Sequence, residues 1–187
     1  MRIITGSAKG MNLKTLPGDD VRPTTEMAKE GVFSCIQFDL EGSRVLDLFA
    51  GSGQLGLEAL SRGAKHCVFA DASAQSIEIV KENAQKTKLY DKCTLLRCEF
   101  GEYLKMAQRG NEKFDFIFLD PPYSMDIFEV CKRVLKANIV KSGAVVFCET
   151  GAEEEKFSGL DGDETFNVDR VKKYKYGRSY VYAIKIK

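Results

Sequence analysis

The stretch LDLFAGSGQLGLEAL, residues 46–60, decides the fold. An apolar run leads into the pattern Gly51-x-Gly53-x-x-Gly56, and an apolar pattern of helical period follows. Glycine at the first two positions permits a positive φ and lets the backbone approach a ligand, and the first turn of a helix leaves N–H groups that can bind it. The stretch therefore predicts a strand, a ligand-binding loop and a helix, in that order.

Beyond this stretch, short apolar runs alternate with longer segments of helical period. This alternation is typical of a parallel sheet covered by helices on both faces. We expect strands over residues 44–49, 67–71, 93–98, 114–119 and 144–149. We expect helices over residues 55–63, 73–86 and 126–140, the last of them ended by Lys141-Ser142-Gly143. The sequence thus predicts an α/β fold with a doubly wound, mostly parallel, Rossmann-like sheet.

We expect the N-terminal residues to form an addition to this core. Residues 2–5 and 11–16 flank a glycine-containing turn like a small hairpin, and Arg22-Pro23-Thr24 leads into a helix, since proline and a capping threonine are typical of a helix start. We therefore predict that residues 1–40 form an N-terminal hairpin and helix and that residues 41–187 form the main domain.

The C-terminal residues differ in composition from the core. Residues 151–164 hold six acidic residues and one lysine, and we expect a solvated loop or a short helix there. The following residues alternate around Tyr176-Gly177-Arg178, which predicts a terminal antiparallel hairpin at the sheet edge. Its lysines and tyrosines suit either an edge strand protected from aggregation or a surface that binds nucleic acid, and the pattern leaves both open.

Composition excludes several classes of protein. The net charge is +1 and 44% of the residues are hydrophobic, as in an ordinary globular domain. The first residues lack the apolar segment of a signal peptide, and no window approaches the roughly 18 to 20 apolar residues of a membrane span. We expect a soluble cytoplasmic protein without a membrane partner. The six scattered cysteines and single histidine predict reduced, packed thiols and no metal site.

The glycine loop alone does not identify a ligand. Asp71, twenty residues after Gly51 at the tip of the second expected strand, is placed to accept hydrogen bonds from ribose hydroxyls. A dinucleotide and S-adenosylmethionine both fit, and a tight turn without a ligand is the alternative. Asp47, inside the first strand, favours S-adenosylmethionine, because a carboxylate attracts the ammonium of a methionine group and repels a pyrophosphate.

The stretch FDFIFLDPPY, residues 114–123, carries the second motif. Proline has no N–H to donate, so Pro121 and Pro122 end the strand and fix the direction in which the chain leaves the sheet. If Asp120 and the Pro121 carbonyl each accept an N–H of a nucleobase amine, its lone pair can be directed at a methyl donor. Tyr123 offers a ring on which a flipped base can stack. The alternative is a strand-ending turn with a packed tyrosine.

Together these motifs resemble one family. LDLFAGSGQLGLEALSRGA (46–64), FIFLDPPY (116–123) and the leading RIITG, RPTTE and LP segments are similar to the RsmD family, the bacterial 16S ribosomal RNA guanine-N2 methyltransferases. The likeness runs from Arg2 to the terminal hairpin. It implies a class I S-adenosylmethionine-dependent methyltransferase fold over residues 41–187. The implied substrate is the N2 amine of a guanine in 16S rRNA of the small subunit, methylated by a monomeric enzyme.

The resemblance also implies site residues. Those for S-adenosylmethionine are Asp47, Phe49, Ala50, Gly51, Ser52 and Gly53 at the methionine end, Asp71 at the ribose, and Glu99 and Phe100 near the adenine. Those for catalysis are Asp120, Pro121, Pro122 and Tyr123. Those for RNA are Arg2, Lys9, Arg22, Pro23 and Thr24. The pattern departs from the family at Lys9-Gly10-Met11 and at residues 26–30, where arginines of the family are absent, so the RNA contacts are the least determined part of the site.

Three alternatives remain at this stage. A DNA amino-methyltransferase shares the chemical residues but needs a separate target-recognition domain, for which the chain has little spare length. A nucleotide-binding oxidoreductase fits the glycine loop but leaves the DPPY motif without a role. A non-catalytic adenosyl-binding protein is the third.

Overall fold

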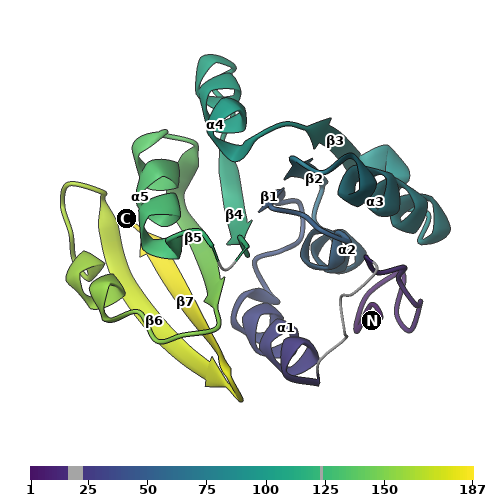
Figure 1. Ribbon diagram of the computed structural model, residues 1–187, viewed down its shortest axis with the longest axis horizontal. Coiled ribbons are helices and arrows are strands. Elements are labelled where there is room, and N and C mark those ends of the chain that lie inside the picture. The colour runs from purple at the N-terminus through teal and green to yellow at the C-terminus, as the bar shows by residue number, and fades with distance from the viewer. Residues whose placement is uncertain (17–22, 123) are drawn as a thin grey trace.

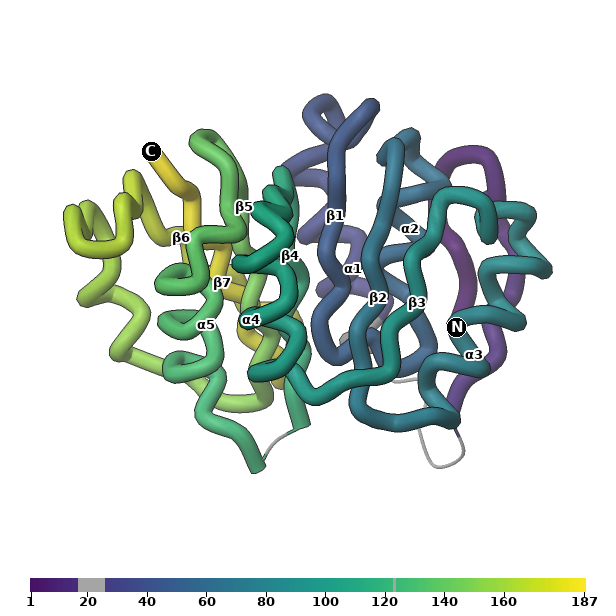
Figure 2. The backbone as a smooth tube through the Cα atoms, turned by 90° about the horizontal axis from the view of Figure 1, so that it is seen from above, coloured from purple at the N-terminus to yellow at the C-terminus, as the bar shows by residue number. Residues whose placement is uncertain are grey.

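Seven strands form a single sheet in the computed structural model, which describes residues 1–16, 23–122 and 124–187, with the backbone alone for residues 23–25. The strands are β1 Arg44–Leu48, β2 His66–Asp71, β3 Cys93–Arg97, β4 Phe114–Leu119, β5 Val140–Thr150, β6 Val168–Tyr176 and β7 Ser179–Ile186. The helices are α1 Pro23–Ile36, α2 Gln54–Ser61, α3 Ala74–Lys86, α4 Phe100–Arg109 and α5 Ile127–Lys136, with the short 3₁₀ helices η1 Tyr90–Lys92 and η2 Glu155–Leu160. The strand order is β3-β2-β1-β4-β5-β7-β6 (Figures 1 and 2).

The order of the strands confirms the predicted doubly wound sheet. β1 pairs in parallel with both β2 and β4, so the direction of winding reverses between β1 and β4. Ligands of such sheets bind outside the carboxyl ends of the strands at this switch point. The predicted terminal hairpin is also confirmed: β7 is antiparallel to β5, and β6 pairs with β7 at the edge.

Helices cover both faces of the sheet. We call the side that carries α1, α2 and α3 the α1 face, and the side that carries α4, α5 and η2 the α5 face. Side chains of a strand alternate between faces. In β4, for example, Phe116 and Phe118 pack on the α1 face, whereas Ile117 and Leu119 pack on the α5 face.

One expected helix boundary was wrong, and one helix was not predicted. The helix expected over residues 126–140 ends at Lys136, because Asn138 has a φ of +53° and the chain turns into β5 at Val140. Lys141-Ser142-Gly143 therefore lies inside a strand, where the pairing with β4 shifts register and Lys141 forms an ion pair with Asp115. The helix α4 was not predicted, although Phe100, Tyr103, Leu104 and Ala107 follow helical spacing and pack on the core.

The flanking segments pack more closely than their sequences indicate. The acidic segment of residues 151–164 contains η2, whose Phe157 is fully buried and stacks on Tyr182 at 4.3 Å between ring centroids. Tyr174 and Tyr176 of β6 pack on the α1 face, with the Tyr176 ring against Gly31 of α1. Tyr182 is therefore buried, and Tyr174 and Tyr176 are half-buried against the α1 face.

The N-terminal residues form a turn closed by the antiparallel bridge of Arg2 and Asn12. The segment lies against α2 and α3 (Figure 1), where Asn83 of α3 exchanges hydrogen bonds with the backbone of Lys14. Among the described residues, no helix combines the length and the apolar character that crossing a membrane requires.

Candidate active site

The glycine loop connects β1 to α2 through left-handed backbone conformations. Phe49, Gly51 and Gly53 have φ values of +73°, +54° and +76°. Gly53 caps the N-terminus of α2, and a Cβ there would also lie 3.1 Å from the side chain of Val80. Glycine at these two loop positions avoids the strain that a side chain would impose. The loop thus presents backbone atoms and the first turn of α2 at the switch point.

Two aspartates hold this loop in place. Asp47 is 3% exposed and accepts a hydrogen bond from the Gly56 N–H at 2.8 Å. Asp71 accepts N–H groups with both oxygens, from Gly51 at 2.9 Å and from Ser73 at 2.8 Å. The Asp47 carboxylate in β1 therefore anchors the first turn of α2, and the Asp71 carboxylate in the neighbouring β2 anchors the glycine loop.

Four acidic side chains lie at or directly after the carboxyl ends of four strands. We call them the carboxylate row: Asp47 of β1, Asp71 of β2, Asp120 after β4 and Glu149 of β5.

Sheet register places the row on one face. Asp47 pairs with Phe69 and Phe118, which both pack on the α1 face. Asp71 and Asp120 each lie two residues beyond one of these phenylalanines and point to the same face, because side chains alternate with a period of two. The same argument applies to Glu149, because Phe147 pairs with Phe118.

The charges within the row act on one another. The pKa of Asp47 is raised to about 7, mainly by burial; the Gly56 N–H opposes the shift, and the charges of Asp120 and Asp71 add to it. The pKa of Glu149 is raised to about 8, first by burial and then by the charge of Asp120, while a hydrogen bond with the Ser179 side chain lowers it. A cation bound beside these carboxyl groups would favour their ionised forms, so the row is suited to a cationic ligand.

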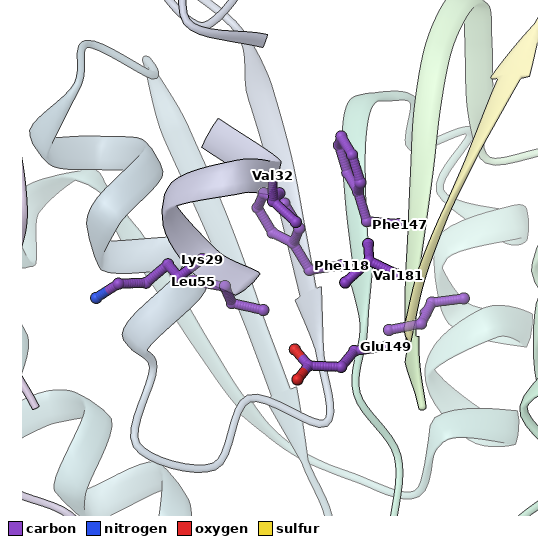
Figure 3. Close-up of a pocket in the computed structure, with 8 residues that line it drawn as sticks. Lys29, Val32, Leu55, Phe118, Phe147, Glu149 and Val181 are labelled. Carbon is purple, nitrogen blue, oxygen red and sulfur yellow. The ribbon is translucent and has the colours of Figure 1, made fainter. Parts of the chain in front are cut away.

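Glu149 was not predicted as a site residue. It lines a small cavity between α1 and the sheet, together with apolar side chains such as Val32, Phe118 and Phe147 (Figure 3). The sequence signal was an acid at the end of the apolar run AVVFCE, the same signal that marked Asp71 and Asp120.

The DPPY motif leaves the sheet as predicted. Asp120 is exposed, Pro121 is buried, and the Pro122 carbonyl accepts the Met125 N–H at 2.9 Å. Asp126 then caps α5 by accepting backbone N–H groups. Tyr123 lies outside the described residues.

Phe49, predicted at the methionine end of the cofactor, and Phe100, predicted near the adenine, both lie on the α5 face. The left-handed conformation of Phe49 turns its ring toward the α5 face, where it packs at 5.4 Å from the Phe100 ring. The Arg133 guanidinium lies 4.2 Å from the Phe100 centroid. Glu99 is exposed at the N-cap of α4. Ala50 and Ser52 are nearly buried in the loop.

The predicted RNA-contact residues are not gathered at one place. Lys9 follows Ser7 and Ala8, whose N–H groups bind Ser61 at the C-terminal end of α2. A helix of eight residues spans about 12 Å, so Lys9 lies at the opposite end of α2 from the glycine loop. Arg2 is exposed. Arg22 lies outside the described residues, and Pro23 and Thr24 begin α1.

A buried ion pair joins the N-terminal segment to the site, and sequence reasoning missed it. Glu58 of α2 is fully buried, accepts the N–H groups of Ile4 and Thr5 at 2.7 and 3.0 Å, and lies 3.6 Å from the Lys29 ammonium. Lys29 also donates to the Arg2 carbonyl at 2.6 Å, and burial lowers its pKa. These contacts hold α1 and the N-terminal segment against α2.

Comparison with known proteins places this geometry in a family. The family described as "Conserved hypothetical protein 95" matches residues 1–185. The chain belongs to this family. The predicted likeness to RsmD proteins is thereby confirmed, since the relatives include "Ribosomal RNA small subunit methyltransferase D" of Haemophilus influenzae, 34% identical over 152 residues, which are 80% of this chain and 78% of that protein.

Two further comparisons agree with this family. "Putative rRNA methyltransferase YlbH" of Bacillus subtilis is 46% identical over 123 residues, which are 66% of this chain and 67% of that protein. A solved structure titled "Putative methyltransferase yhhF from Escherichia coli" superposes with a TM-score of 0.82 at 26% identity, covering 100% of this chain and 98% of that one. The predicted class I methyltransferase fold is confirmed.

Proposed function

We propose that this protein transfers a methyl group from S-adenosylmethionine to the exocyclic N2 amine of a guanine in 16S rRNA. The observation that carries the proposal is the carboxylate row, which begins beneath the glycine loop at Asp47 and continues to Asp120 of the DPPY motif. Family membership and the names of the relatives support rRNA as the acceptor.

The residues of the row fit S-adenosylmethionine. This cofactor carries a sulfonium and an ammonium, and bound here it would supply an electrophilic methyl group. Asp47 and the loop from Phe49 to Gly53 would hold the methionine end, and Asp71 the ribose, with Glu99 and Phe100 toward the adenine. A dinucleotide pyrophosphate would instead be repelled by the same carboxylates, which argues against an oxidoreductase.

Asp120 and Pro121 would orient the acceptor. A nucleobase amine is a weak nucleophile because its lone pair is delocalised into the ring. Asp120 and the Pro121 carbonyl, each accepting one N–H, would hold the amine with its lone pair directed at the methyl group, and the buried Pro121 keeps that carbonyl rigid. Tyr123 would stack on the base. No strong base is needed, because the amine becomes acidic once it is methylated and can release its proton to water.

The wider surroundings of the substrate belong to the same proposal. The enzyme acts as a monomer on the small subunit or an assembly intermediate of it. Residues 1–40 form an extension on the methyltransferase domain of residues 41–187, and Arg2, Lys9, Arg22, Pro23 and Thr24 of this extension contact RNA.

Transfer of labelled methyl groups tests the proposal. S-adenosylmethionine with a labelled methyl group is incubated with the protein and undermethylated small subunits, naked 16S RNA or duplex DNA. Label in the subunits or the RNA is the expected result. Label in DNA alone would instead indicate a DNA amino-methyltransferase, and cofactor binding without transfer to any of the three would refute the proposed acceptor.

A further inference from the structure

Glu149 is the member of the carboxylate row to which the proposed methyl transfer assigns no role. Leu119 pairs with Cys148, so the residues that come next, Asp120 and Glu149, lie side by side at the ends of neighbouring strands. Such strands lie about 4.8 Å apart, and both side chains point to the α1 face. One planar ligand can therefore contact both carboxylates.

The surroundings of Glu149 leave it suited to a hydrogen-bond donor from outside the protein. In Figure 3 its carboxylate points into the cavity beneath α1, while the ammonium of Lys29, which lines the same cavity, points away from it. That ammonium is bound by Glu58 and the Arg2 carbonyl. The cavity has room for about one water molecule, roughly 10 Å³, so a base must lie at its mouth, outside the strand ends.

Two adjacent carboxylates match the edge of one nucleobase. Guanine presents N1–H and N2–H donors side by side on its Watson–Crick edge, whereas adenine presents a lone pair at N1. An ionised carboxylate can only accept hydrogen bonds. Flipped bases are read by hydrogen bonds to this edge. We propose that Glu149 accepts the N1–H of the target guanine while Asp120 accepts an N2–H, so that the pair selects guanine.

This assignment rests on the proposed function and adds a specificity residue to it. The raised pKa of Glu149 agrees with it, because a carboxyl whose charge is disfavoured by burial and by Asp120 gains most from a donor brought by the substrate. The competing account is that Glu149 has only a structural role, through its hydrogen bond with Ser179 at the start of β7. Only the proposed role predicts that replacing Glu149 changes which base is methylated.

The decisive probe is 2-aminopurine, which keeps the 2-amino group of guanine but has a lone pair at N1. Once the methylated nucleotide has been mapped, 16S RNA with guanine or 2-aminopurine at that position is assembled into subunits. Single-turnover rates on both are measured at pH 8.5, above the pKa of Glu149 near 8, for the wild-type protein, Glu149→Gln and the control Ser179→Ala. The glutamine amide can donate to the N1 of 2-aminopurine, which an ionised glutamate cannot do.

We expect the wild-type protein and Ser179→Ala to prefer guanine by at least about tenfold, and Glu149→Gln to lose most of that preference. An unchanged ratio in Glu149→Gln would overturn the assignment, as would a wild-type ratio near one. Should Glu149→Gln fail to bind S-adenosylmethionine, Glu149→Ala replaces it and must slow transfer to guanine more than transfer to 2-aminopurine. A wild-type protein that never methylates guanine N2 would refute the proposed function itself.

Discussion

The two halves of the site are built differently. At β1 and β2, Asp47 and Asp71 are engaged by backbone N–H groups of the glycine loop and the turn after β2. At β4 and β5, Asp120 is an exposed side chain beyond its strand, and Glu149 interacts with another side chain, Ser179. The first half is held by backbone hydrogen bonds, whereas the second consists of side chains that we propose contact the substrate. Substitutions in the first half should therefore weaken cofactor binding and folding, and those in the second should slow transfer.

The largest effect is expected at Asp120. Asp120→Ala removes the acceptor that orients the amine, and we expect the single-turnover rate to fall by about a hundredfold or more, with S-adenosylmethionine affinity unchanged within about twofold. Asp120→Asn, which keeps one acceptor oxygen, is the matched control and should retain part of the rate. If affinity fell as much as rate, the division between the halves would be wrong.

Asp71 tests the other half. Asp71→Ala leaves the Gly51 and Ser73 N–H groups without their acceptor and removes the proposed ribose contact, so Kd for S-adenosylmethionine should rise by about ten- to a hundredfold. Asp169→Ala, an exposed acid on β6, serves as the control. Calorimetric titration measures both, and an unchanged Kd in Asp71→Ala would show that the cofactor lies elsewhere.

Gly56 tests how tightly the first half is packed. A Cβ at this position would lie 2.3 Å from the Phe69 ring and 2.7 Å from the Cys67 sulfur. We expect Gly56→Ala to lower the free energy of unfolding by about 1–3 kcal/mol. Gly159→Ala, whose Cβ would meet nothing within 4 Å, should leave it nearly unchanged. Urea denaturation compares the two, and equal stabilities would mean that α2 can move away from the sheet.

The smallest effect is a dependence of stability on pH. Glu149 has a pKa near 8 in the folded protein and a lower one when unfolded, so the folded state binds more protons between these values. Stability should therefore fall as pH rises from about 5 to 8. Around Glu149, Asp120 adds to the shift, Ser179 opposes it, and the Lys29 ammonium points away.

Glu149→Gln should reduce this loss of stability without abolishing it, because Asp47, with a pKa near 7, contributes in the same direction. The melting temperature of both proteins at pH 6 and pH 8.5 measures the difference. If the melting temperature fell as much between pH 6 and pH 8.5 in Glu149→Gln as in the wild-type protein, the environment assigned to Glu149 would be wrong.

The sequence predicted the parts of the site that depend on neighbours in the chain. Gly51, Gly53 and the strand-ending Asp71 and Asp120 follow local rules of turn and strand, and the structure places them at the switch point. Glu149 ends an apolar run as Asp71 does, but only the pairing of β5 with β4, nearly thirty residues earlier, places it beside Asp120.

Other parts were inaccessible for the same physical reason. The Lys29–Glu58 contact joins two helices and the N-terminal segment, which are distant in sequence, so no local pattern predicts it. The end of α5 is set by Asn138 and by pairing of β5 with β4. The helix α4, by contrast, carries Phe100, Tyr103, Leu104 and Ala107 at helical spacing, so its periodicity was open to prediction. The motifs were predictable because they depend on residues adjacent in the chain. The residues that tertiary packing brings next to those motifs were not.

The identity of the methylated atom tests the central claim most directly. After transfer of labelled methyl groups to small subunits, the RNA is digested to nucleosides and the labelled product is identified by mass spectrometry against standards. Asp120 beside the glycine loop predicts N2-methylguanosine as the labelled product. Label in N1-methylguanosine or on a ring carbon would contradict an acceptor amine held by Asp120, and label in N6-methyladenosine would contradict guanine as the methylated base.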